Sequence, residues 1–214
     1  MSISSAAPRR HLLAHASPTA LLALGALTIM LATPAAAPAQ DAPPQAGRWS
    51  LRIPSGGFVP TGAQRRSIDD AQVTGAQLSW LARPGIALTG TFAWARSRDV
   101  AATDAPKLDV FTSDVGIEVR SAERFTEGPV ALRAFAGLGA GARSYNYRSM
   151  DVDATHNLAA YGSVGGELGM GRVGVRLEAR DYATGFRPLV GAGKSQSRND
   201  VVVMAAIRFN RNRQ

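Results

Sequence analysis

Arginines and carboxylates alternate at every second position in several segments of this 214-residue chain. In VGVRLEARDY, residues 173–182, Arg176, Glu178 and Arg180 share one face of an extended chain, and apolar residues share the other. Charges enclosed at this spacing must pair with one another or line a pore, and arginine offers carboxylates a rigid fork of donors. The corresponding faces of all segments supply these candidates: Arg52, Asp114, Glu118, Arg120, Arg133, Glu167, Arg176, Glu178, Arg180 and Arg208.

Metal and cofactor sites are not expected from the remaining polar residues. Asp151, Asp153 and His156 lie close together in DVDATH, but a loop with two acids is usually only hydrated. The stretch PLVGAGKS at 188–195 ends like a phosphate-binding loop, yet Pro188 stands where that motif requires glycine. Cysteine is absent, which excludes disulfides and thiolate metal sites.

The N-terminal residues 1–39 are predicted to be a secretory signal peptide. Arg9 and Arg10 precede an apolar run at 20–32, and a small-x-small cleavage site follows at 37–39. We expect a Pro-rich linker at 40–47, one folded domain at 48–209 and a short basic tail at 210–214. Without the two leader arginines, 22 basic and 16 acidic residues leave a charge of +6, with no long basic run. Export and this charge pattern argue against nucleic-acid binding.

Segments with a period of two follow one another along the predicted domain, which indicates about eight strands. Their expected ranges are 48–59, 71–81, 86–98, 108–120, 130–147, 157–169, 173–183 and 200–209. The connections alternate between a mostly short set (82–85, 121–129, 171–172) and a mostly long set (60–70, 99–107, 148–156, 185–199). Short turns at one rim and long loops at the other are typical of an up-and-down outer-membrane barrel.

Alternation alone leaves open which face points inward, because soluble and membrane barrels produce the same pattern. The placement of the aromatic residues favours the membrane barrel, since two belts flanking an aliphatic band are selected at lipid interfaces. We therefore expect the apolar face to point outward and the charges to line the lumen. The predicted membrane-interface aromatics are Trp49, Trp80 and Phe209 at one rim and Phe58, Trp94 and Phe111 toward the other.

The signal peptide and the segments WSLRIPSGGFVPTG, VGVRLEARDY and VVVMAAIRF resemble the small outer-membrane β-barrel proteins of double-membrane bacteria. The resemblance is to the eight-stranded group that includes the OmpA-type transmembrane domain, and it spans roughly residues 47–209. It implies an all-β, antiparallel, up-and-down transmembrane barrel of about eight strands, which we expect to be a monomer. The last strand, which closes on Phe209, is similar to the signal read by the barrel-assembly machinery, although NRNRQ follows it. Outer-membrane lipid and lipopolysaccharide are the expected partners.

Three functions remain open at this level. The first is a structural or surface-interaction barrel whose lumen is plugged by the Arg/Asp/Glu network. The second is a narrow channel for small solutes, in which the excess of arginine sets selectivity.

The third function is a lipid-modifying enzyme, which would need a nucleophile activated by a base. His156 is the only histidine beyond the predicted leader, and Ser144 lies near it in sequence. Because Asn157 and Leu158 follow it, the His-x-Ser spacing of barrel deacylases is missing. Arginines flanking Glu118 and Glu178 would suppress an acid role for either carboxylate. We therefore predict no catalytic residue.

Overall fold

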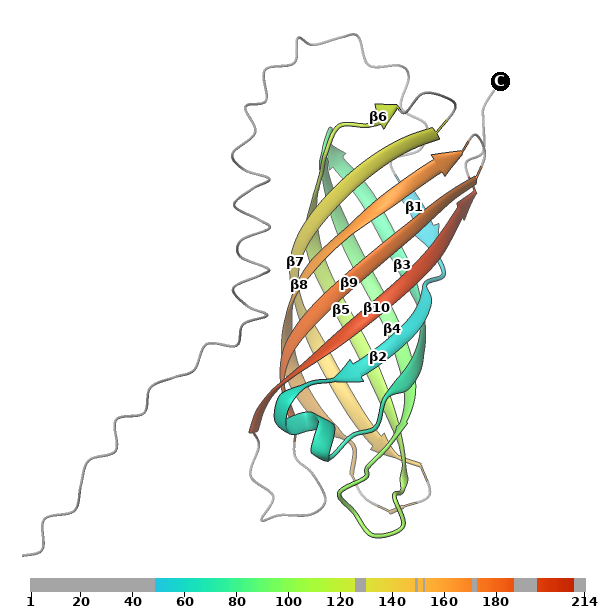
Figure 1. Cartoon of the computed structure of the whole chain (residues 1–214). Coiled ribbons are helices and arrows are strands. Elements are labelled where there is room, and N and C mark those ends of the chain that lie inside the picture. Colours follow the sequence, from blue (N-terminus) through green and yellow to red (C-terminus); the bar gives the residue numbers. More distant parts are fainter. Residues whose placement is uncertain are drawn as a thin grey trace, which may run out of the picture. The chain divides into compact units, whose positions relative to one another are not determined.

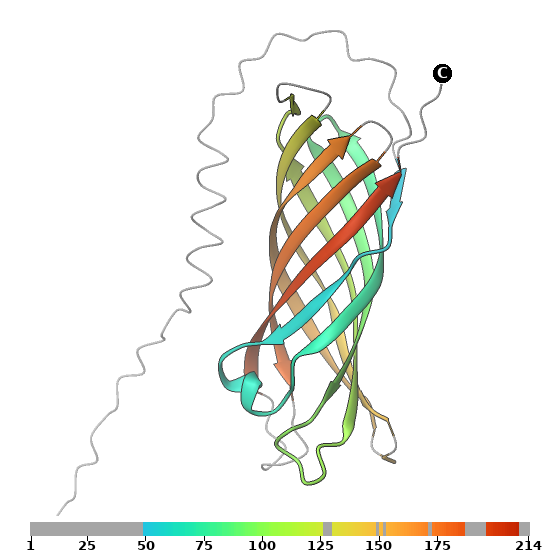
Figure 2. The same cartoon turned by 45° about the vertical axis from the view of Figure 1, so that its right-hand side comes forward.

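The computed structural model describes residues 49–125, 130–148, 150–151, 153–170, 173–186 and 196–209. These residues form a closed antiparallel barrel (Figures 1 and 2). The strands are β1 (Trp49–Arg52), β2 (Ser55–Pro60), β3 (Ala71–Arg83), β4 (Ile86–Arg98), β5 (Lys107–Arg120), β6 (Arg124–Phe125), β7 (Val130–Tyr147), β8 (Thr155–Met170), β9 (Val173–Phe186) and β10 (Gln196–Phe209), with a 3-10 helix η1 (Gly62–Arg66). Among the described residues, no helix is long and apolar enough to cross a membrane. The predicted signal peptide, linker and basic tail lie outside the described residues.

The barrel has eight strands because β1 and β2 together make one of them, which confirms the predicted fold class. Both pieces pair with β3, and β2 also pairs with β10 to close the sheet. The break falls at Ile53 and Pro54, since proline has no N–H to give to a ladder. β6 pairs only with β7 and extends one rim of the barrel. Sequence periodicity located the eight strands but missed this break and β6.

The register fixes the width of the barrel. Paired residues followed once around the sheet lead from Leu81 of β3 back to Ala71 of the same strand, ten residues away. Eight strands with this stagger tilt by about 40° from the barrel axis. A barrel of this size has an interior just wide enough for side chains to fill it.

The two ends of the barrel differ. The terminal end carries the start of β1, the end of β10, β6 and the strand ends at which β3 leads to β4, β5 to β7 and β8 to β9 (Figure 1). The loop end carries the strand ends at which β2 leads to β3, β4 to β5, β7 to β8 and β9 to β10. At the terminal end, Gly85 turns β3 into β4 with a φ of 76°, a conformation that glycine adopts without strain. At the loop end, η1 and the residues after it fold over the lumen, so that Gln64 and Ile68 are fully buried.

The faces of the strands are reversed relative to a soluble barrel. Large apolar side chains are exposed on the outside, including Val115 (70%) and Leu158 (87%), whereas arginine and carboxylate side chains are buried inside. The apolar surface runs around the sheet and includes Leu51, Ile53, Leu78, Leu88, Phe92, Ile117, Leu138, Val164, Leu177, Val203 and Ile207. The apolar face therefore points outward, as we expected from the aromatic pattern.

Aromatic side chains lie on the outer surface near both ends, with one correction. Trp49 stacks on Trp80 at the terminal end, and Trp94 stacks on Phe111 toward the loop end, with ring centroids 5.9 and 6.3 Å apart. Phe58, in contrast, is only 1% exposed and lies inside the barrel, so its prediction as an interface residue was wrong. The side chain of Phe209 lies outside the described residues.

The error at Phe58 has a simple cause. Phe58 stands six positions after Arg52, an even step, so alternation places both on the same, inward face. Its nearness to the rim does not decide which face it occupies, because the alternation does.

Candidate functional site

The lumen near the terminal end is organised around Arg176 of β9. Its guanidinium contacts three carboxylates: Glu118 of β5, Glu167 of β8 at 2.9 Å, and Glu178 of its own strand at 3.0 Å. The same guanidinium carbon lies 3.5 Å from the ring centroid of Phe135. Because the side chain of Arg176 is 3% exposed, these partners replace the water that would otherwise solvate its charge.

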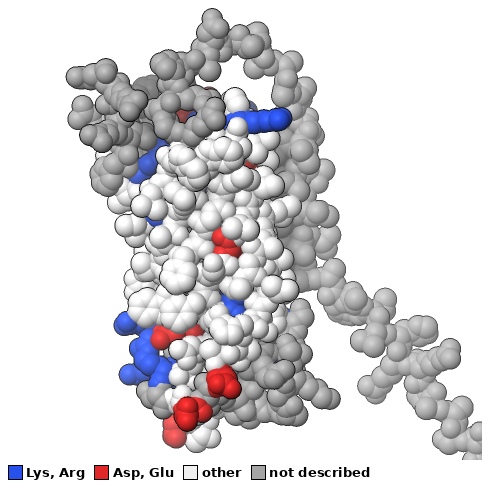
Figure 3. All heavy atoms as spheres, turned by 180° about the vertical axis from the view of Figure 1, so that it is seen from behind, with Lys and Arg blue, Asp and Glu red and all other residues white. Residues whose placement is uncertain are grey.

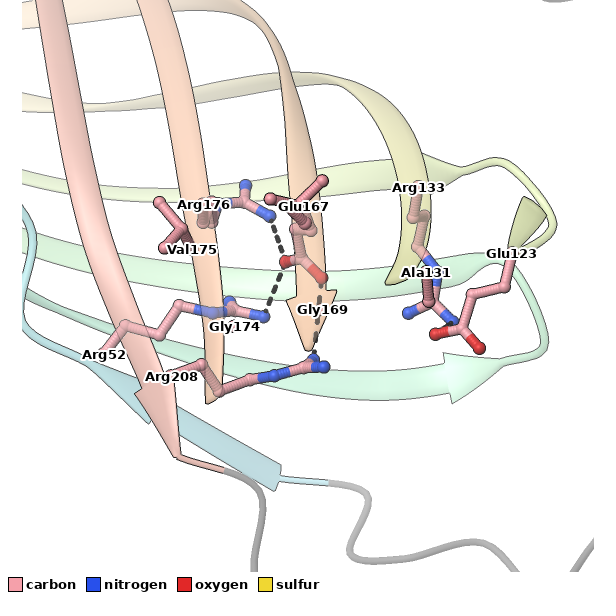
Figure 4. A pocket seen from close by; sticks show the side chains of 11 residues that line it. Arg52, Glu123, Ala131, Arg133, Glu167, Gly169, Gly174, Val175, Arg176 and Arg208 are labelled. Carbon is pink, nitrogen blue, oxygen red and sulfur yellow. Dashed lines mark hydrogen bonds and ion pairs between the residues drawn. The ribbon is translucent and has the colours of Figure 1, made fainter. Parts of the chain in front are cut away.

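The carboxylate of Glu167 contacts three arginines, which come from three different strands (Figure 4). Arg52 of β1 and Arg176 approach one carboxylate oxygen at 3.0 and 2.9 Å, and Arg208 of β10 approaches the other at 3.5 Å. The first and last strands of the barrel therefore meet β8 and β9 at a single acidic group. The contacts to Glu167 therefore link β1 to β8, β9 and β10, which follow one another in the sheet.

A second set of charges lies further toward the loop end. Arg180 donates to Asp114 at 3.0 Å and to Glu178 at 2.6 Å, and the hydroxyl of Tyr182 donates to Asp114 at 2.7 Å. The Arg180 guanidinium also stacks on the ring of Tyr161, 4.6 Å from its centroid. Glu178 thus bridges Arg176 and Arg180 and joins the two sets into one network.

The members of this charge network were all among the sequence candidates: Arg52, Asp114, Glu118, Arg120, Glu167, Arg176, Glu178, Arg180 and Arg208. Arg120 belongs to it through Glu118, at 2.6 Å, and also donates to Ser79.

Arg133 is the candidate that the structure leaves out of the charge network. Although its backbone pairs with Glu167 in the sheet, its guanidinium turns away to Glu123 at 2.7 Å (Figure 4). The side chains of this pair are 25% and 39% exposed, at the terminal mouth of the barrel. Arg133 stands near the start of β7, so its long side chain reaches the preceding connection.

The loop-end half of the lumen contains a further pair of buried charges, which was not among the candidates from the sequence. Arg143 of β7 and Asp200 of β10 form a fully buried ion pair. The Arg143 guanidinium lies over the rings of Phe58 and Tyr182, at 5.4 and 4.2 Å from their centroids. Alternation could have found both charges, because Arg143 is in phase with Arg133 and Asp200 with Arg208.

Apolar and aromatic side chains surround this pair and fill the rest of the loop-end lumen. We call this set the loop-end core; it comprises Phe58, Ile68, Val73, Leu108, Val110, Tyr145, Tyr147, Tyr161, Tyr182, Val202 and Met204. Tyr147 also donates its hydroxyl to Asp99 at 2.6 Å beside the connection that follows β4.

Glycines make room for the larger rings of this core. A Cβ atom added at Gly139 would lie 2.4 Å from the ring of Tyr161 and 2.5 Å from a backbone oxygen of β5. Only glycine permits such a close approach.

Little free volume remains in the lumen. A cavity of about 20 Å³ lies at the terminal mouth beside Arg52, Arg176 and Arg208, and one of about 10 Å³ lies between Arg143 and Met204. Each is about the size of a single water molecule. Within the part of the chain that the structure describes, the charge network and the loop-end core therefore occupy the lumen in two successive layers.

Ser144 and His156 are brought together on the outer surface. The Ser144 hydroxyl lies 2.7 Å from Nδ1 of His156, across the β7–β8 pair. The described residues provide no carboxylate hydrogen-bonded to this histidine, and none of them form a cluster of metal-binding type. The arrangement is a serine–histidine pair without the third group that orients a catalytic base.

Comparison with known proteins gives a match in structure alone. No protein-family model and no curated protein matches the chain. The solved structure of Neisserial surface protein A is similar, with a TM-score of 0.52 and 8% identity over 76% of this chain and 97% of that one. Outer membrane protein W of E. coli gives 0.42 and 16% over 75% and 97%, and Ail, the attachment invasion locus protein of Yersinia pestis, gives 0.40 and 10% over 74% and 96%.

Proposed function

We propose that this chain, whose fold is that of the small eight-stranded outer-membrane β-barrels, is a sealed barrel with a structural or surface-interaction role in the outer membrane. In this proposal the charge network and the loop-end core close the lumen, and the protein works through its outer surface and its loop-end connections.

The observation that carries the proposal is the two-layer filling of the lumen. A solute crossing the terminal half would have to separate Arg176 from three carboxylates in a nearly dry interior, where breaking an ion pair is costly. It would then meet the loop-end core, in which Phe58, Val110 and Tyr145 are at most 2% exposed. Apolar constrictions exclude water and ions, so the second layer opposes conduction independently of the first.

The outer surface supports a location in a membrane. Exposed apolar side chains cover the barrel between the Trp49–Trp80 stack and the Trp94–Phe111 stack, as lipid-facing surfaces do. Outer-membrane barrels place short turns in the periplasm and long loops outside, so the terminal end would be periplasmic and the loop end extracellular. The predicted signal peptide at 1–39 is consistent with export to this membrane.

Conductance in a planar bilayer tests the seal. We expect the wild-type barrel to give no steady single-channel steps. A variant that thins both layers, Arg176→Ala with Phe58→Ala, should give steps if it remains folded, because it removes the central cation and a large ring. A matched control, Arg124→Ala with Phe92→Ala, removes a cation and a ring from exposed positions and should stay silent.

Steady steps from the wild type that change on replacing Arg176 would contradict the seal and favour the narrow channel. Cold and boiled gel mobility of the membrane fraction comes first, since a closed barrel resists SDS until it is heated. Recovery of the protein in the soluble periplasmic fraction, with no shift on boiling, would refute the membrane location.

A further inference from the structure

A group of cations stands on the outside of the barrel, just beyond the loop-end aromatic residues. Along β4 and β5 the outward pairs run Trp94–Phe111, then Arg96–Asp109, then Arg98–Lys107. The backbone N–H of Arg148, which follows β7, donates to the carbonyl of Lys107 at 3.0 Å. We call Arg96, Arg98, Lys107 and Arg148 the basic patch.

The patch borders a hollow in the surface. A shallow cavity of about 250 Å³ lies between these four cations and Asp69 and Asp70. Seen from behind, the barrel shows a broad area of mostly uncharged side chains, and Lys and Arg gather below it at the lower left, with Asp and Glu beside and below them (Figure 3).

Three of the four cations in the basic patch form no ion pair with the described residues, although Asp69 and Asp70 border the same hollow. Arg148 forms an ion pair with Asp109, which also accepts a hydrogen bond from Trp94 at 3.1 Å. Arg96 stacks on the ring of Trp94, 4.1 Å from its centroid. Among the described residues, no carboxylate forms an ion pair with Arg96, Arg98 or Lys107. Asp70, which borders the hollow, forms its ion pair with Arg65, at 3.5 Å.

The height of the patch relative to lipid follows from the strand geometry. On the outer face of β4, Ile86, Leu88 and Phe92 are exposed and apolar, and Trp94 follows them before the first cation. In a strand tilted by 40°, two residues span about 5 Å along the barrel axis. Arg96 and Arg98 therefore lie about 5 and 10 Å beyond Trp94 in the direction of the loop end. Aromatic belts mark the boundary of the hydrocarbon, which puts the patch at the level of the lipid headgroups.

We propose that the basic patch is a binding site for the phosphate groups of outer-leaflet lipopolysaccharide, an inference that rests on the membrane location and orientation proposed above. The side chains face sideways into the headgroup layer, where a phosphorylated glycolipid lies beside the barrel. Arginine binds phosphate through two parallel N–H donors, and the rings of Trp94 and Phe111 lie below it against the acyl chains. Arg96 lies at one height along the barrel axis, and Arg98 and Lys107 lie further toward the loop end. Cations at two heights suit a ligand that carries more than one phosphate.

The test measures how lipopolysaccharide stabilises the full-length folded protein in detergent. A ligand that binds only the folded barrel raises the temperature at which the cold gel mobility is lost. Purified lipopolysaccharide, its dephosphorylated form, phosphatidylglycerol and inorganic phosphate are titrated separately. We expect a rise with intact lipopolysaccharide that is greatly reduced for the other three ligands.

Variants assign this effect to the patch. Arg96→Gln/Arg98→Gln/Lys107→Gln should raise the half-saturating lipopolysaccharide concentration at least tenfold, since three charge-assisted contacts are lost. The matched control Arg66→Gln/Arg83→Gln/Arg124→Gln removes the same charge from exposed positions elsewhere and should bind as the wild type does. Asp69→Asn/Asp70→Asn should instead tighten binding, because it removes the acids of the hollow.

Equal stabilisation of the wild type and the triple Gln variant would overturn the site. Equal stabilisation by intact and dephosphorylated lipopolysaccharide would overturn phosphate as the group that is bound. Equal stabilisation by phosphatidylglycerol or inorganic phosphate would overturn lipopolysaccharide as its source. The stabilisation measurement does not depend on conductance. It therefore tests lipopolysaccharide binding even if the lumen conducts and the proposed seal is wrong.

Discussion

Arg143 and Asp200 form an ion pair inside the loop-end half of the barrel, where their side chains are 1% and 0% exposed. The pair joins β7 to β10 through the loop-end core, and the rings of Phe58 and Tyr182 cover the guanidinium. Two charges in an apolar interior depend on each other, because either one alone would be buried without a partner.

Removal of one member of this pair is expected to be far more costly than removal of both. Asp200→Asn should lower the free energy of unfolding by about 3 to 5 kcal/mol, and Arg143→Met/Asp200→Leu should recover most of that loss. Urea unfolding in lipid vesicles measures both. As a control, Asp70→Asn breaks the exposed Arg65–Asp70 pair and should cost about 1 kcal/mol or less. A double variant as unstable as Asp200→Asn would contradict this account.

The opposite orientations of Leu51 and Phe58 predict different chemical accessibility. Because the chain has no cysteine, Leu51→Cys and Phe58→Cys each introduce a single thiol. We expect a small membrane-permeant maleimide, at a pH high enough to form the thiolate, to label Leu51→Cys at least tenfold faster than Phe58→Cys. Leu51 is 67% exposed on the outer surface and lies two residues from the interfacial Trp49, whereas Phe58 is only 1% exposed. Labelling of both after denaturation controls for reactivity. If folded Phe58→Cys were labelled as fast as Leu51→Cys, the side chain of Phe58 would face the lipid and its inward orientation would be wrong.

The contacts of Glu167 predict an order of effects among its partners. Glu167→Gln removes the carboxylate from Arg52, which is 1% exposed and approaches it at 3.0 Å, and should cost about 3 kcal/mol or more. Arg208→Gln should cost about 1 kcal/mol or less, since Arg208 is 25% exposed and 3.5 Å away. Arg133→Gln, at the exposed Glu123 pair, should be equally mild. Vesicle unfolding curves that reverse this order would show that the network is differently arranged.

The Ser144–His156 pair leads to an expected negative result. Its hydrogen bond spans 2.7 Å, but no described carboxylate orients the imidazole. We expect the mass spectrum of lipid A to be the same in cells that express the wild type, His156→Ala or no protein. A lipid A species that appears with the wild type and disappears with both Ser144→Ala and His156→Ala would make the chain an enzyme.

The sequence by itself determined the strands, their alternating faces and the side on which lipid is expected. Period-two patterning is a local property that the backbone pleat imposes, so ranges such as 86–98 and 130–147 coincide with β4 and β7. Alternation also places Arg143, Asp200 and Phe58 on the inner face, although the candidates chosen from the sequence omitted the first two and Phe58 was placed outside.

Only the tertiary structure decided which inward charges meet. The pairing of Arg52 with Glu167 joins residues more than a hundred positions apart, and it depends on the ten-residue stagger that sets how far each strand is displaced around the barrel. The same stagger places the loop-end core next to the charge network along the barrel axis. The pairing of Arg98 with Lys107, in contrast, follows from the local register of the β4–β5 hairpin. Alternation along one strand says which face a side chain occupies, but its height in the lumen depends on closure of the whole sheet.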